Sequence, residues 1–303
     1  MSMAHPESVT ITDVALRDGL QNHPRTVPTV TKLVLLDRLL DAGIRSMEVA
    51  SVVHPRLVPQ MADAEAVLRG LPAGVDADFQ VLVPNLRGLE RAVAAGARHV
   101  RVVLSVSEGH SRSNTNRSVD EGIAQTREVV RRAREVPGLA VTGALATVFV
   151  CPFDGVVPTA QVERVVGALV GMGLDEISLS DTLGKADPGH VERTVVAMRQ
   201  SFPDTTFGLH LHNTYGMGLA NVLAGLNQGV RQFDSALGGI GGCPFAPGAA
   251  GNVATEDVAF MLRALGVETG IELDRLAVAA ADLRAALGSP LESSVARALG
   301  WAA

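Results

Sequence analysis

The chain has 303 residues, 47% of them hydrophobic and 19% charged, with a net charge of −6. This composition provides for a large buried core, and neither the net charge nor any block of basic residues favours a nucleic-acid partner. No apolar run reaches the roughly 18 residues of a membrane span, and the first ten residues lack the features of a signal peptide, so we expect a soluble, cytoplasmic protein without a membrane partner.

Cysteine and lysine are scarce in this chain. Cys151 and Cys243 are its two cysteines, which excludes a disulfide framework and a four-cysteine zinc site. Lys32 and Lys185 are its two lysines, which leaves few candidates for Schiff-base chemistry.

Eight β-like runs follow one another along the chain, and most are separated by one helical pattern. The runs span residues 9–14, 46–51, 78–83, 99–106, 140–148, 176–180, 206–212 and 232–237. Before four of these runs a glycine occupies the position that ends a helix, namely Gly43, Gly96, Gly173 and Gly229. Ser118 and Glu121 form the pattern of a capping box at the start of another helix.

Alternating strands and helices predict an α/β fold with a parallel sheet, and eight such units predict a closed (β/α)8 TIM barrel over about residues 9–254. The alternative, an open doubly wound sheet, usually has a glycine-rich loop after its first strand, whereas this strand runs into LRDGLQN. We expect one domain over 1–303, in which the residues from about 255 form additional helices that cap the barrel near its active-site face.

Polar side chains recur where the predicted strands end, which is the face that carries the chemistry of barrel enzymes. They are Arg17 and Asp18 at the end of the first strand, Glu48 in the second, Asp181 at the end of the sixth, and His210 and His212 in the seventh.

His210 and His212 share one face of their strand because side chains alternate with a period of two. Two imidazoles and one carboxylate make a good site for a divalent metal ion, and Asp18 is the best carboxylate candidate, because the eighth strand joins the first to the seventh. Other interpretations remain: core histidines bonded to neighbours, and a structural ion pair between Arg17 and Asp18 or Glu48.

The segment GGIGGCPFAPGAAGN, residues 238–252, follows the last predicted strand and contains six glycines. Such a loop can approach a ligand closely or move as a lid, with Cys243 in its middle and Asn252 at its end. The alternative is a flexible surface turn. We favour the active-site loop, since an exposed thiol in a mobile loop is a liability.

Four motifs together resemble the 3-hydroxy-3-methylglutaryl-CoA (HMG-CoA) lyase family of DRE-TIM metallolyases, over about residues 9–290. They are RDGLQN, EISLSDTLG, HLHNTYGMGLAN and GGIGGCPFAPGAAGNVATED, in that order. The resemblance implies cleavage of HMG-CoA to acetyl-CoA and acetoacetate, as in leucine catabolism, with one Mg²⁺ or Mn²⁺ ion and no organic cofactor.

The resemblance also implies roles for individual residues. Asp18, His210, His212 and Asn252 would bind the metal; Arg17 would stabilise the enolate; Cys243 would transfer a proton; Asp181 would assist the substrate hydroxyl; Glu48 would support the site; and Arg17, Gln21 and His110 would bind substrate. Two departures concern substrate binding. HPRTV follows RDGLQN where a lysine is common in the family, so Arg25 is the replacement candidate for the CoA phosphates, and His110 stands where an aromatic residue is expected.

Four alternatives remain open at this point. The same cleavage could act on another 3-hydroxyacyl-CoA, such as a longer 3-alkyl-3-hydroxyglutaryl-CoA, or the chain could be an acetyl-CoA-condensing synthase. A metal-free aldolase would use Lys185, which we interpret as a surface residue. A non-catalytic binding protein would have no need of Cys243. Apolar helices such as VERVVGALVGMG suit a homodimer and ordinary barrel packing equally.

Overall fold

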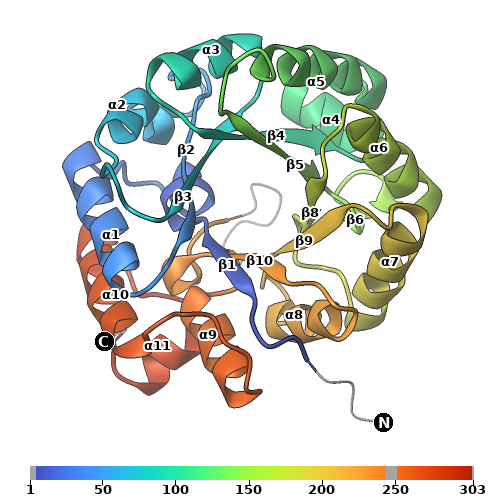
Figure 1. The fold of residues 1–303 in the computed structure, drawn as a ribbon. Helices are drawn as coiled ribbons and strands as arrows, with labels where there is room; N and C mark the ends of the chain where they lie inside the picture. Colours follow the sequence, from blue (N-terminus) through green and yellow to red (C-terminus); the bar gives the residue numbers. More distant parts are fainter. Residues whose placement is uncertain (1–4, 243–250, 302–303) are drawn as a thin grey trace.

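The structure is a computed structural model that describes residues 5–242 and 251–301. Eight parallel strands close into a barrel in the order β1-β10-β9-β8-β5-β4-β3-β2 (Figure 1). The strands are β1 (Thr10–Asp13), β2 (Ser46–Ser51), β3 (Asp78–Val83), β4 (His99–Ser105), β5 (Ala140–Ala146), β8 (Glu176–Asp181), β9 (Thr206–Leu211) and β10 (Gln232–Ser235). All eight predicted runs are therefore confirmed, and the fold is a (β/α)8 barrel.

Helices surround the barrel as an outer ring (Figure 1). They are α1 (Thr29–Asp41), α2 (Ala64–Arg69), α3 (Leu86–Ala94), α4 (Glu108–Thr115), α5 (Val119–Ala133), α6 (Thr159–Gly171), α7 (Pro188–Ser201), α8 (Gly218–Asn227), α9 (Thr255–Ala264), α10 (Leu273–Leu287) and α11 (Ser294–Ala298). The predicted capping box at the start of α5 is present. Gly43 adopts φ +92° after α1, where an added Cβ would lie 2.1 Å from the Gly270 carbonyl oxygen, so only glycine fits.

The seventh predicted strand shows how the barrel separates its two faces. Phe207, Leu209 and Leu211 of β9 are buried and belong to the hydrophobic core between strands and helices. Gly225 of α8 lies so close that an added Cβ would be 2.3 Å from Leu209, which brings the helix directly onto the strand. The other face of β9, with His210, points into the barrel, as predicted.

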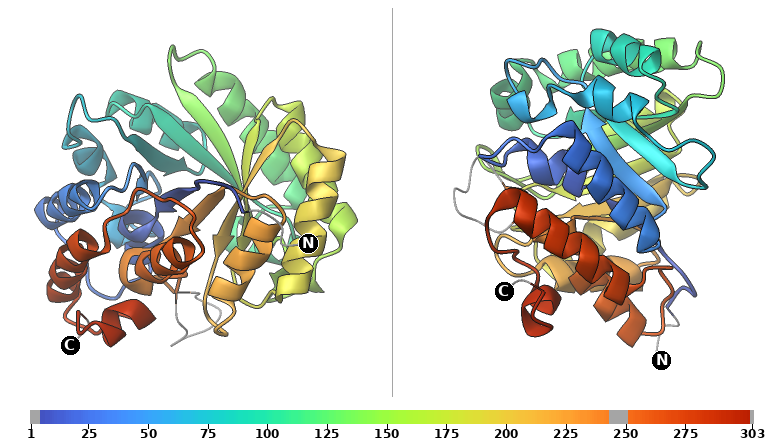
Figure 2. Two further views of the ribbon diagram at one scale, coloured as in Figure 1. Left: turned by 60° about the horizontal axis from the view of Figure 1, so that its bottom comes forward. Right: turned by 90° about the vertical axis from the view of Figure 1, so that its left-hand side faces the viewer.

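The chain after residue 255 completes and extends the ring. Helix α9 follows β10, the last strand of the barrel, and α10 packs beside α1 (Figure 2, right). Beyond α10, the backbone N–H of Glu292 donates to the Gly238 carbonyl at 2.9 Å, in the short 3₁₀ turn η3 (Leu237–Gly239) that follows β10. This extension thus contacts the carboxyl end of the barrel.

Two local features differ from the predictions. Strand β1 ends at Asp13, and the prediction that Arg17 and Asp18 end this strand is wrong, because both lie in a π-helical turn, η1 (Ala15–Gly19). A small hairpin, β6 (Val150–Cys151) and β7 (Gly155–Val156), follows β5 and was not predicted. Among the residues described, no helix has the length and apolar character needed to cross a membrane.

Candidate active site

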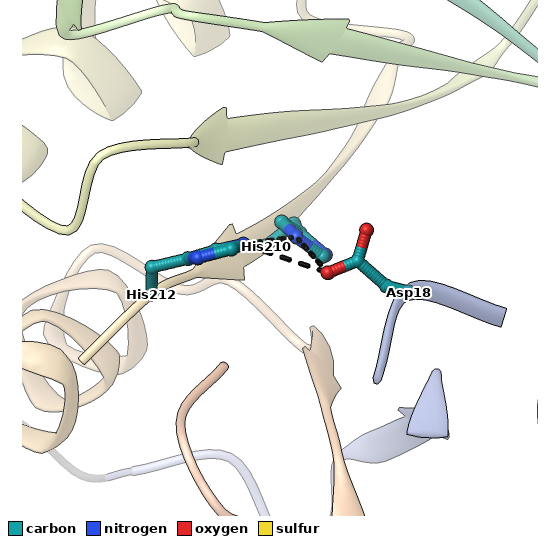
Figure 3. A group of neighbouring side chains, drawn as sticks. All are labelled: Asp18, His210 and His212. Carbon is teal, nitrogen blue, oxygen red and sulfur yellow. Dashed lines mark hydrogen bonds and ion pairs between the residues drawn. The ribbon is translucent and has the colours of Figure 1, made fainter. Parts of the chain in front are cut away.

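Three side chains converge at the carboxyl ends of the strands (Figure 3). His210 and His212 come from β9 and the residue that follows it, and Asp18 comes from η1. Asp18 Oδ2 lies 3.6 Å from His212 Nε2 and 4.0 Å from His210 Nε2. The two Nε2 atoms are 3.2 Å apart. Three ligand atoms of this kind, all within 4.8 Å of one another, form a candidate site for a divalent metal ion.

Strand order and the π turn explain this convergence. Strand β10 pairs with both β1 and β9, so the chain after β1 lies near the end of β9, as predicted. In the π turn the Gly19 N–H donates to the Val14 carbonyl at 3.1 Å, and this wider turn carries Asp18. An added Cβ at Gly19 would lie 2.6 Å from Ile240, so glycine allows the turn to pack against the segment after η3.

Asn252 joins the group through an isolated bridge with His212. Its side chain is buried, and Nδ2 donates to Asp18 Oδ2 at 2.8 Å and to the Ile240 carbonyl at 3.1 Å. Its Oδ1 is buried with no hydrogen-bond partner among the described residues. An unpaired buried amide oxygen beside two imidazoles and a carboxylate fits the oxygen and nitrogen donor set of a divalent ion.

A buried cation adjoins the candidate metal site. Arg17 donates from Nε to Glu48 and from Nη1 to Asp18, each at 2.5 Å, and Glu48 is fully buried. Burial alone would lower the pKa of Arg17, but the charges of Glu48 and Asp18 outweigh it and raise the pKa above its usual range. Arg17 is therefore a permanent positive charge beside the ligand group.

The same charges act on the ligands. Burial would raise the pKa of Asp18, but the charge of Arg17 and the hydrogen bond from Asn252 hold it well below its usual range, so Asp18 is a carboxylate. Burial lowers the pKa of His212 to about 4, against the opposing charge of Asp18. A neutral imidazole and an ionised carboxylate are the protonation states that bind metals.

Asp234 also touches this group, Arg101 contacts Asp234 in turn, and the sequence reasoning missed both residues. Asp234 Oδ2 lies 3.2 Å from His210 Nδ1 and accepts from Arg101 Nη1 at 2.7 Å. The available signal was the period of two in the predicted strand 232–237, which places Asp234 on the same face as Gln232, toward the barrel interior.

The structure does not bring Asp181 into the ligand group. Glu176 and Ser178 of β8 line the barrel interior, so Asp181 shares the opposite face with Ile177 and Leu179. Its carboxylate accepts from the backbone N–H groups of Lys185 and Ala186. Burial raises its pKa to about 6. Its contacts hold the turn between β8 and α7, while the predicted role toward the substrate hydroxyl stays a prediction.

The remaining predicted residues occupy different places. Gln21 follows the π turn, and its Oε1 is buried without a partner among the described residues. His110 of α4 is buried and its Nδ1 lies 2.8 Å from Ser105 Oγ. Arg25 donates to the Ala286 carbonyl in α10 at 3.1 Å. Lys185 is exposed, as expected of a surface lysine. The prediction for Cys243 concerns a residue outside the described part of the chain.

The fold is a (β/α)8 barrel, and a candidate metal centre lies at the carboxyl ends of its strands beside a buried arginine. These features define the class: barrel enzymes with a candidate divalent metal centre. The chain belongs to the HMGL-like family, whose model matches residues 8–283.

Curated relatives and a solved structure support this family assignment, and their similarity extends over nearly the whole chain. The chain is 42% identical to the mitochondrial hydroxymethylglutaryl-CoA lyase of Bos taurus, covering 97% of this chain and 90% of that protein. It is 44% identical to the (R)-citramalyl-CoA lyase of Chloroflexus aurantiacus, covering 96% and 95%. It also resembles the structure of an HMG-CoA lyase from Acinetobacter baumannii in complex with coenzyme A and 3-methylmalate, with a TM-score of 0.91, 38% identity, and coverage of 98% and 96%.

Proposed function

We propose that this protein is a divalent-metal-dependent lyase that cleaves HMG-CoA to acetyl-CoA and acetoacetate. The observation that carries the proposal is the convergence of Asp18, His210 and His212 beside the buried Arg17–Glu48 pair. The HMG-CoA lyases among the relatives support the substrate. The reaction is a retro-Claisen cleavage: the 3-hydroxyl loses its proton, the C2–C3 bond breaks, and the electron pair passes to the thioester enolate, whose carbon then gains a proton.

We assign the metal to Asp18, His210, His212 and Asn252, and the ion to Mg²⁺ or Mn²⁺. When bound, such an ion lowers the pKa of the substrate hydroxyl and orients the oxygens next to it. Asp18 and the two imidazoles supply the charge and lone pairs of the site, and Asn252 supplies the amide oxygen that lacks another partner in the described chain.

The other residues act around this group. Arg17, held cationic by Glu48, stabilises the negative charge that develops on the enolate oxygen. Cys243 is our candidate for the group that protonates the enolate carbon. Gln21 and His110 contact the substrate. For Asp181 we propose assistance to the hydroxyl chemistry through the turn that its carboxylate holds.

Finer proposals accompany the activity: a single domain over 1–303, a cytoplasmic location, a place in leucine catabolism, and a homodimer. Light scattering on the protein as it leaves a size-exclusion column tests the homodimer, which should have twice the 31.6 kDa mass of one chain.

Substrate identity is tested with two thioesters. (R)-Citramalyl-CoA carries its carboxylate one methylene nearer to the hydroxyl carbon than HMG-CoA does. With Mg²⁺ present, we expect kcat/KM for HMG-CoA to exceed that for (R)-citramalyl-CoA by roughly 10-fold or more, the discrimination that one methylene commonly gives. A preference for (R)-citramalyl-CoA would contradict the proposed substrate and keep the reaction class.

A further inference from the structure

Asp234 and Arg101 form an ion pair across the barrel interior that ends on a predicted metal ligand. Arg101 comes from β4 and Asp234 from β10, which stand opposite each other in the closed strand order. Arg101 Nη1 donates to Asp234 Oδ2 at 2.7 Å, and both side chains are nine-tenths or more buried. This ion pair is thus a long-range contact, and the barrel must close before the two side chains can meet.

The Asp234 carboxylate oxygen that accepts from Arg101 also faces His210. His210 Nδ1 lies 3.2 Å from Asp234 Oδ2, and the strand register sets Asp234 directly beside His210. When Nδ1 carries the proton and donates it to Asp234, Nε2 is left with its lone pair. That Nε2 atom is the one that faces His212 Nε2 at 3.2 Å and Asp18 Oδ2 at 4.0 Å.

The surroundings of Asp234 explain why it needs a fixed partner. It lines a polar cavity of about 210 Å³ at the amino ends of the strands, together with Arg101, His99, Asp78 and Glu176. In such a cavity a carboxylate held by one bond could turn away from His210. Arg101 from one side and Ser178 Oγ, at 3.4 Å, from another hold it in place.

We propose that Asp234, clamped by Arg101, is a positioning residue that fixes the tautomer and orientation of His210 for metal binding. This inference rests on the proposed metal site and deepens it, since the predicted ligands His212 and Asp18 face Nε2 of the His210 ring, whereas Asp234 faces Nδ1. The alternative is a purely structural ion pair between β4 and β10 that contacts His210 incidentally.

The test is the affinity of the substrate-free protein for Mn²⁺, followed through the EPR signal of free Mn²⁺. We expect Asp234→Asn to raise the Kd for Mn²⁺ by about 10- to 100-fold, the usual effect of losing the outer partner of a metal-bound histidine. Asp78→Asn is the matched control: Asp78 lies 2.8 Å from His99 Nδ1 and lines the same cavity, but touches no predicted ligand. It should leave the Kd within about twofold of the parent.

A double variant separates positioning from folding. Asp234→Asn alone leaves Arg101 buried without its partner, whereas Arg101→Met with Asp234→Asn removes both charges. We expect the double variant to recover thermal stability and still bind Mn²⁺ about 10-fold or more weakly. Unchanged affinity in Asp234→Asn, or affinity that returns with stability in the double variant, would overturn the inference. A parent protein that fails to bind Mn²⁺, or binds it equally after His212→Ala, would instead contradict the proposed metal site.

Discussion

Replacing Glu48 with glutamine should both destabilise the fold and slow catalysis. The Glu48 side chain is fully buried, and its Oε2 accepts from Arg17 Nε at 2.5 Å. Glutamine keeps the shape and one acceptor oxygen but removes the charge. Arg17 then retains Asp18 as its one carboxylate partner among the described residues, at 2.5 Å from Nη1.

The magnitude follows from this geometry. Removing one member of a buried ion pair costs about 3–5 kcal/mol, and the acceptor that glutamine keeps places the loss near the lower end, at about 3 kcal/mol. Because Arg17 would turn toward Asp18, its charge would leave the position where the enolate develops, and a displacement of that kind lowers kcat by about 10²-fold.

Urea unfolding followed by circular dichroism measures the first effect, and acetyl-CoA release measures the second. Glu135→Gln is the control, because Glu135 forms a solvent-exposed pair with Arg131, and this change should leave both measurements unchanged. A Glu48→Gln protein with the parent's urea midpoint and kcat would refute the reasoning.

Three further predictions concern the pH dependence of stability, the glycine at the turn beside His212, and the alternative Schiff-base aldolase. Burial raises the pKa of Glu256 from 4.5 to about 8, so between these values the folded chain holds a proton that the unfolded chain has released. The free energy of unfolding should therefore fall with rising pH across this window by up to about 1.4 kcal/mol per unit, and urea titrations of Glu256→Gln should show a flatter slope. At Gly184 (φ +64°) an added Cβ would lie 2.9 Å from the His212 carbonyl oxygen, whereas at Gly216 (φ +75°) it would meet nothing within 4 Å. Mn²⁺ binding should weaken in Gly184→Ala and stay at the parent level in Gly216→Ala, and equal affinities would contradict this. Lys185→Ala should retain activity, with no product trapped by borohydride, because Lys185 is exposed; loss of activity with trapping in the parent would favour the aldolase.

The barrel could be predicted because its signals are local. Each strand is a short apolar run, and glycines with positive φ end the helices before them, as at Gly43 and Gly96. The pairing of His210 with His212 follows from the period of two in a strand. The proximity of Asp18 follows from the order in which a closed barrel brings its first and seventh strands together.

The rest of the site depends on packing that the sequence does not display. The π turn that carries Asp18 has no sequence signature and forms where Gly19 packs against Ile240. The Arg101–Asp234 pair joins residues 133 positions apart across the barrel. Asp181, in contrast, could have been placed from the sequence, because the same period of two sets it on the face of Leu179, opposite Glu176 and Ser178, which line the barrel interior.

The most direct test of the central claim is acetyl-CoA release from HMG-CoA by the purified protein with Mg²⁺, before and after removal of the ion with EDTA. We predict release with Mg²⁺, its loss with EDTA, its return when Mg²⁺ is restored, and its absence in His210→Ala. Release that persists with EDTA, or that is unchanged in His210→Ala, would contradict a metal-dependent lyase at this site.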